Sequence, residues 1–182
     1  MPDALAVAPR ITTERLVLRQ LELSDFDAFA AQLMDAAAMA PLAVVPTRAA
    51  AWQKLASFNG QWTLTGAGWW AVELRETRQL AGTVGAFFRE TSLVRGALPD
   101  DADLEIGWTI FPAHRRRGVA TEAARAALSH GFERHAVVKR AIAHVDPPNV
   151  ASARVCEALG MSLEGEVDFY ETRLRRYVIS RH

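Results

Sequence analysis

Residues 104–122 read LEIGWTIFPAHRRRGVATE, and the fold depends on how this stretch changes character. Residues 104–111 predict a strand, which Pro112 ends because proline cannot continue a sheet ladder. From Gly118 to about Arg134, apolar residues recur at helical spacing and predict a helix. A strand therefore gives way to a helix across a loop that contains three consecutive arginines and one glycine.

The start of that helix is a candidate anion site. The first N–H groups of a helix have no partner within it, and they carry a partial positive charge. Gly118 has no side chain that would keep a ligand from the backbone, and the arginines at 115–117 add charge. The spacing R-x-x-G-x-A suits a pyrophosphate, whereas the Walker and Rossmann signatures are absent. Alternatively, Gly118 only eases the turn and the arginines form a solvated collar.

Patterns elsewhere predict a single α/β domain with a mixed sheet. Helices are expected after three capping residues, Ser24, Thr47 and Asn149, with the second ending near Gly66 and the third at Gly160. Further strands are expected at 15–21, 69–74, 80–88, 140–145 and in two closing segments, the last being 171–180. We expect residues 1–10 to form a loose leader and residues 11–182 to form the domain.

Composition limits the classes of partner and binding site that we expect. Lys+Arg and Asp+Glu both number 21, so the formal net charge is zero, and we expect no binding to nucleic acid or membrane through bulk charge. No apolar stretch is long enough to span a bilayer. The single cysteine, Cys156, excludes an intrachain disulfide, and no Cys/His cluster predicts a metal site. We expect a soluble cytoplasmic protein in which Cys156 is buried and inert.

Several motifs in order resemble one family. The run FPAHRRRGVATEAARAALSHGF, preceded by LEIGWTI and followed by DPPNVASARVCEALGM, resembles the GNAT superfamily of N-acetyltransferases. The opening ITTERLVLRQLELSDFDAF is similar to its RimJ/RimL branch. The resemblance covers nearly the whole chain. It implies one α/β domain whose mostly antiparallel, splayed mixed sheet has about seven strands and is flanked by about four helices.

The resemblance also implies acetyl-CoA as co-substrate, an amine as acceptor and no metal. The pyrophosphate is expected on the N–H groups of residues 115–121 and the pantetheine arm along residues 108–110. Asn149 is expected to touch that arm and Ser152 to lie near the sulfur, although Asn149 is also an ordinary N-cap. The implied cofactor-binding residues are Trp108, Thr109, Ile110, Arg115, Arg116, Arg117, Gly118, Val119, Ala120, Thr121, Asn149 and Ser152.

Acetyl transfer requires a neutral amine and a protonated or stabilised thiolate. Glu105, on the strand placed at the splay, is the expected base, and the alternative is a charge on a solvent face. Ser152 and Tyr170 compete as the acid for the thiolate. Weaker candidates for acid–base work are Glu73, Glu166, Asp168, Glu171 and His144.

The acceptor stays open between a protein N-terminus and a small amine. A rival function is a non-catalytic module that binds acyl-CoA and has lost the chemistry. Exposed strand edges are compatible with a homodimer.

Overall fold

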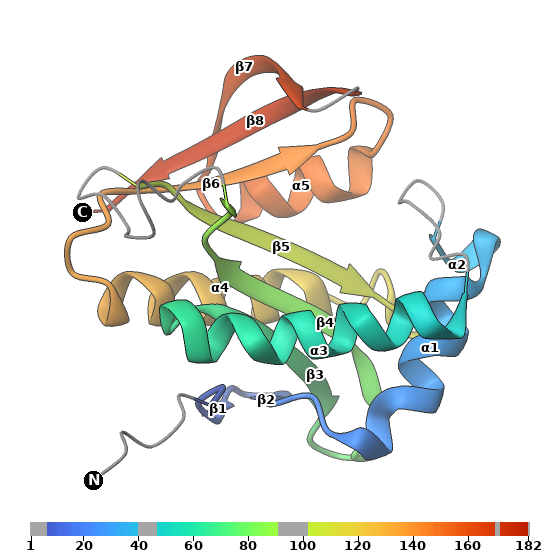
Figure 1. Cartoon of the computed structure of the whole chain (residues 1–182). Coiled ribbons are helices and arrows are strands. Elements are labelled where there is room, and N and C mark those ends of the chain that lie inside the picture. Colours follow the sequence, from blue (N-terminus) through green and yellow to red (C-terminus); the bar gives the residue numbers. More distant parts are fainter. Residues whose placement is uncertain (1–6, 40–46, 91–101, 170–171, 182) are drawn as a thin grey trace, which may run out of the picture.

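One sheet of eight strands runs through the molecule (Figure 1). The structure is a computed structural model that describes residues 7–39, 47–90, 102–169 and 172–181. The strand order is β1-β2-β3-β4-β5-β6-β8-β7, and every neighbouring pair is antiparallel except β5 with β6. The strands are β1 (Ile11–Thr12), β2 (Leu16–Arg19), β3 (Gly68–Leu74), β4 (Leu80–Phe87), β5 (Leu104–Ile110), β6 (Arg140–Val145), β7 (Ser162–Phe169) and β8 (Thr172–Ser180).

Helices cover both faces of this sheet. Those described are α1 (Phe26–Met34), α2 (Ala36–Met39), α3 (Arg48–Thr65), α4 (Val119–Arg134) and α5 (Val150–Ala158), with short 3-10 turns at Leu23–Asp25 and Pro112–His114. Alanines of α4 share one core cluster with Leu104 and Ile106, whereas Phe29 of α1 and Leu55 of α3 form a second cluster with Ala71. The predicted splayed α/β domain is confirmed. It has one strand more than expected because the two-residue β1 pairs with β2.

Helix ends follow local capping chemistry, with one correction. The hydroxyl of Thr47 caps α3, and Gly66 ends that helix in the left-handed region at φ 69°, as predicted. Ser24 is not the cap of the first helical segment. The N–H of Glu22 instead donates to the Asp25 carboxylate over 2.8 Å, and the two residues form a reciprocal capping box.

Residues 7–10 differ from the loose leader that we expected. Ala8 is buried in the main core cluster. The indole Nε1 of Trp70 donates to the carbonyl of Pro9 over 2.8 Å. A buried indole N–H needs such a partner, so this contact holds the segment against the sheet.

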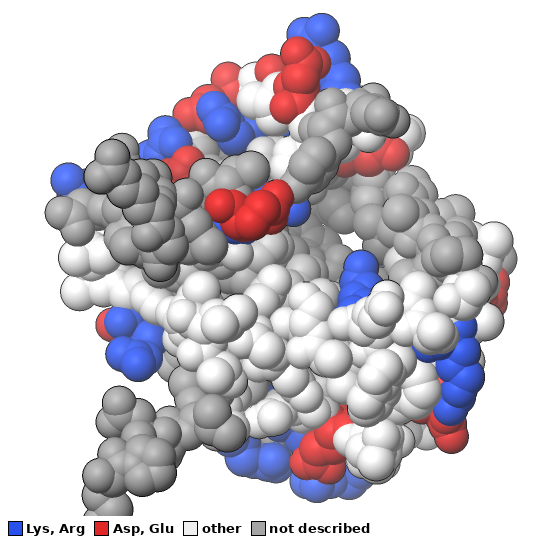
Figure 2. All heavy atoms as spheres, viewed as in Figure 1, with Lys and Arg blue, Asp and Glu red and all other residues white. Residues whose placement is uncertain are grey.

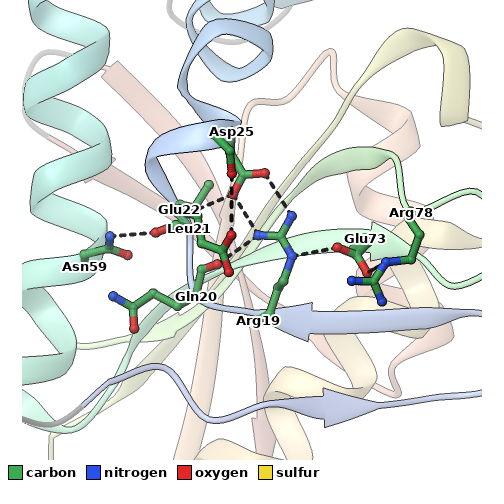
Figure 3. Close-up of polar contacts among 9 residues, drawn as sticks. Arg19, Gln20, Leu21, Glu22, Asp25, Asn59, Glu73 and Arg78 are labelled. Carbon is green, nitrogen blue, oxygen red and sulfur yellow. Dashed lines mark hydrogen bonds and ion pairs between the residues drawn. The ribbon is translucent and has the colours of Figure 1, made fainter.

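A buried ion network joins β2, the start of α1 and β3 (Figure 3). The guanidinium of Arg19 makes two hydrogen bonds to Asp25, at 2.7 and 2.9 Å, and a third to Glu73, at 2.7 Å. These side chains are only 13%, 7% and 3% exposed. The nearby carbonyl of Leu21 accepts from the side chain of Asn59, which ties α3 to the same corner. The network therefore fixes how the helical layer sits on the sheet edge.

Arg19→Met should lower the free energy of unfolding by about 3–5 kcal/mol, because two buried carboxylates lose their shared partner. Urea unfolding checks this. The matched control is Arg48→Met, which breaks an exposed Arg–Asp pair in the same helical layer and should cost no more than about 1 kcal/mol. Equal losses in the two variants would contradict a structural role for burial of the Arg19 network.

Candidate functional site

The sheet opens between β5 and β6. These strands pair at only two positions, Leu104 with Ala141 and Glu105 with Ile142. Beyond them, β5 continues along β4 as far as Ile110, whereas β6 continues along β8. The two strands therefore diverge, as Figure 1 shows. The splay begins after Glu105, on the strand where the resemblance placed it, and in the described part of the chain no strand pairs with this edge of β5 beyond that point.

A cavity of about 680 Å³ lies at this opening. That volume is within the range typical of sites for small molecules. Eleven of the twelve predicted cofactor-binding residues line it: Trp108, Thr109, Ile110, Arg115, Arg116, Gly118, Val119, Ala120, Thr121, Asn149 and Ser152. The structure thus brings together segments that are about 40 residues apart in the sequence.

Four further residues line the same cavity and were not assigned from the sequence. They are His114, Ala151, Arg154 and Val155. The last three have the spacing i, i+3, i+4 and so share one face of α5. That periodicity could have identified them, and Arg154 adds a cation beside the arginines of the loop.

The loop before α4 is shaped by its backbone. Gly118 lies in the left-handed region at φ 76° immediately before the helix, and Arg116 is also left-handed at φ 57°. Nε of Arg115 donates to the carbonyl of Ile110 over 2.8 Å, so this side chain folds back onto the end of β5. The first-turn N–H groups of α4 lie at residues that line the cavity.

Thr13 and Arg15, in the turn between β1 and β2, bind this loop and the start of α4, and we call these two residues the clamp. Glu122, in the first turn of α4, accepts from the hydroxyl of Thr13 at 2.6 Å and from Nε of Arg15 at 2.7 Å. Burial raises the pKa of Glu122, but these bonds and the charge of Arg15 outweigh it and leave the pKa below its usual value. Nη1 of Arg15 also donates to the carbonyl of Arg117 over 2.8 Å.

Arg117 is the predicted cofactor residue that does not line the cavity. It lines a neighbouring groove with Arg15 and Arg75 instead. A Cβ atom at Gly118 would lie 3.0 Å from Nη2 of Arg15, so a side chain there would meet the clamp. Arg115 and Arg116 thus both line the cavity, with Arg115 also bound to Ile110, whereas Arg117 lines the neighbouring groove.

The start of α5 completes the cavity. The side-chain oxygen of Asn149 accepts from the N–H of Ser152 over 3.1 Å, which confirms the predicted N-cap. Both residues also line the cavity, so the cap and the ligand-facing roles are compatible. Cys156, one turn further on, is fully buried, and burial raises its pKa to about 12. Its burial agrees with the expectation, and a thiol whose pKa is raised carries little reactive thiolate.

Glu105 lies on the opposite face of the sheet from α4, because its neighbours Leu104 and Ile106 point into the α4 core. It is 5% exposed, so the expected alternative of a solvent-facing charge is wrong. Nε and Nη2 of Arg89, on one edge of its guanidinium, both donate to the carboxylate, the second over 2.5 Å, and Nδ1 of His144 lies 3.3 Å from Oε1.

Burial raises the pKa of Glu105, but its contacts with His144 and Arg89 outweigh this and hold the pKa below its usual value. Glu105 is therefore a paired anion with low affinity for a proton. It does not line the cavity.

The other acid–base candidates are dispersed. Glu73 belongs to the buried Arg19 network, and Glu166 makes an exposed pair with Arg173. Tyr170 and Glu171 lie outside the described residues. Among the residues that the structure describes, no group of three or more His, Cys, Asp or Glu side chains could hold a metal ion. No described helix has the length and apolar character needed to cross a membrane.

Comparisons with known proteins agree with this geometry. The family model described as an acetyltransferase (GNAT) domain matches residues 15–162. The uncharacterized N-acetyltransferase YnaD of Bacillus subtilis is 30% identical over 155 residues, which are 85% of this chain and 84% of that protein. An acetyltransferase structure from Agrobacterium tumefaciens is 25% identical, covers 96% of this chain and 95% of its own, and has a TM-score of 0.79.

A GNAT-family acetyltransferase structure from Bacillus anthracis is 26% identical, with a TM-score of 0.73 over 94% of this chain and 98% of that one. RimL, an acetyltransferase of ribosomal L7/L12 solved with coenzyme A, shares the fold at 15% identity, with a TM-score of 0.74 over 94% of this chain and 98% of that one. The family model covers most of this chain, and its match includes the open edge of β5, the arginine loop and the start of α5. The chain therefore belongs to the GNAT family of acetyltransferases.

Proposed function

We propose that this protein is an N-acetyltransferase that moves the acetyl group of acetyl-CoA directly to a primary amine. The observation that carries the proposal is the cavity where β5 and β6 diverge, because it joins an anion-binding helix start to an unpaired strand edge. Coenzyme A combines a pyrophosphate with an arm that contains two amides, so it matches both halves of this lining.

Each half of the cavity has a distinct role. The first-turn N–H groups of α4, at Val119 to Thr121, would receive the pyrophosphate, with Arg116 and Arg154 adding charge. Residues 108–110 of β5 would pair with the pantetheine amides, as an added strand does, because β6 no longer occupies that edge. Arg115 acts indirectly, since its bond to Ile110 holds the loop against the strand.

The chemistry follows from the same arrangement. The amine nitrogen attacks the thioester carbonyl, a C–N bond forms, and the C–S bond breaks. A backbone N–H on the open edge of β5 would polarise that carbonyl. Ser152, at the cavity wall, would supply a proton to the departing thiolate. An acyl-cysteine step is not part of the proposal, because Cys156 is buried with its pKa raised to about 12.

The acceptor would approach from the side of α1 and α3, opposite the α4 face. Figure 2 shows that side: its coloured acidic and basic residues lie mainly around the periphery, and uncharged residues occupy the middle. Such a surface suits an acceptor chosen by shape and by its amine. A protein N-terminus, as the RimJ/RimL resemblance implies, and a small amine are the two acceptor classes that we propose.

Acetyl-CoA should stabilise the protein, whereas ATP and NAD should not. At a hundred times the Kd, a ligand of the native state adds about 2.7 kcal/mol, or roughly 5–10 °C of Tm for a domain of this size. Thermal unfolding with each ligand measures this.

Thr121→Asp should weaken acetyl-CoA binding roughly 10- to 100-fold, because a carboxylate in the first turn of α4 repels the phosphates.

The control is Thr121→Asn, which has the same shape without the charge and should bind within a few-fold of the unaltered protein. An aspartate at this position also favours the helix start, so the fold should persist. Equal binding by both variants would contradict a phosphate site at α4. Binding of acetyl-CoA without release of free CoA in the presence of amines would instead indicate the non-catalytic module.

Ser152→Ala should lower kcat by roughly 10- to 100-fold and leave the affinity for acetyl-CoA unchanged, since the hydroxyl acts only as the thiolate departs. Release of CoA thiol in the presence of spermidine or a peptide with a free amino terminus measures kcat. Ser129→Ala, on the exposed side of α4, serves as the control. A Ser152→Ala protein with full activity would leave the thiolate to water or to Tyr170.

A further inference from the structure

We propose that His144 is the general base that takes the proton from the acceptor amine, and that Glu105 positions it. This deepens the proposed function and rests on it. In this assignment the base is the imidazole of His144, and not the buried carboxylate of Glu105 beside it. It also assigns a role to the cluster of Arg89, Glu105 and His144, which lies where the sheet opens.

The two residues share a face of the sheet. On β6, Ala143 and Val145 belong to the core cluster beneath α4, so His144 between them faces the other side. Glu105 faces that same side. His144 lies two residues beyond Ile142, the last residue of β6 that pairs with β5. It therefore lies at the split itself, on the face from which an acceptor would approach the thioester.

The contact between them orients the imidazole. Nδ1 of His144 lies 3.3 Å from Oε1 of Glu105, and no other acceptor among the described residues competes for a hydrogen on it. The ring also packs against Phe169, with 4.8 Å between ring centroids. The two imidazole nitrogens lie on different edges of the ring, so Nε2 points away from the carboxylate. A carboxylate at Nδ1 keeps the hydrogen there and leaves the lone pair on Nε2.

The charges around the ring support this role. Glu105 and Arg89 pair with each other, and Arg176 of β8, which lies opposite His144 in the ladder, pairs with Glu164 at 2.5 Å. Each arginine near the ring is therefore already paired with a carboxylate before the reaction begins. When the imidazole gains a proton, the nearby carboxylate of Glu105 stabilises the cation. Imidazole changes charge near neutral pH, which suits a general base better than a carboxylate paired with arginine.

The proton balance is as follows. The acceptor enters as an ammonium ion and gives one proton to Nε2 of His144, which later releases it to solvent. The neutral amine then forms the C–N bond as the C–S bond breaks. The nitrogen gives up a second proton, which ends on the sulfur of CoA. The products are the amide, free CoA and one proton.

The first test needs no acceptor. Nitrogen-15 NMR of histidine-labelled protein reports which ring nitrogen of His144 carries the hydrogen, and His144→Gln assigns the signal by its disappearance. We expect hydrogen on Nδ1 and a bare Nε2 in the neutral ring. A neutral ring with its hydrogen on Nε2 would overturn the proposal, because Nε2 would then be unable to accept a proton.

The second test is kinetic. His144→Gln should lower kcat roughly 10²- to 10⁴-fold for spermidine or for a peptide with a free amino terminus, and it should abolish the fall of kcat toward acid pH. Glu105→Gln should lower kcat by a smaller factor than His144→Gln and leave KM unchanged, because the ring loses the carboxylate that orients it. His135→Gln, at the far end of α4, is the matched control and should leave the profile unchanged.

The outcomes separate the two proposals. A His144→Gln protein that keeps the normal pH profile would overturn the base assignment even if acetyl transfer is real. If the unaltered protein fails to bind acetyl-CoA, the proposed function is wrong, whichever ring nitrogen of His144 carries the hydrogen. If neither amine is acetylated, the NMR result alone decides whether His144 is oriented as a base. Acetyl-CoA affinity and Tm, measured for each variant, exclude misfolding as the cause of a slow rate.

Discussion

The early end of pairing between β5 and β6 is the constraint on which the rest of the structure depends. A backbone group without a partner is costly when buried, at about 1–3 kcal/mol, so an open edge inside a sheet must face solvent or a ligand. Here the edge is held open because β5 stays paired with β4 and β6 with β8. The start of α4 and the start of α5 both meet at the resulting gap.

At the split, the two faces of the sheet carry different kinds of chemical group. On the α4 face, the cavity is lined by the start of α4 and by Arg115 and Arg116 of the loop, and such a lining suits an anionic ligand. On the other face, Glu105, His144 and Arg89 form a compact group of ionisable side chains. The two sets meet only at the gap between the strands. A reaction that joins an acyl donor from one side to an acceptor from the other would need this separation.

The strand, the arginine loop and the helix start of the cavity could be predicted from local patterns, whereas their association in one site followed only from the family resemblance. Strand, loop and cap are local patterns, so Gly118 and Asn149 could be assigned without tertiary contacts. The surroundings of Glu105 could not, because Arg89 lies in the segment after β4 and His144 lies on β6, both distant from Glu105 in the sequence. The cap at Glu22 was missed although it is local, because Ser24 is the more usual capping residue type and Asp25 also binds Arg19 of β2. An irregular loop has no period, so the direction of Arg117 was likewise beyond reach.

The burial of Cys156 has a practical consequence. It is the only cysteine in the chain, and its thiol is enclosed, with a pKa raised to about 12. A thiol-reactive dye added to the folded protein should therefore find almost no thiolate to label. In the reaction proposed above, the CoA sulfur freed from the thioester would then be the thiol that the dye labels. The same dye, added while the protein is heated, would mark the moment at which the core opens.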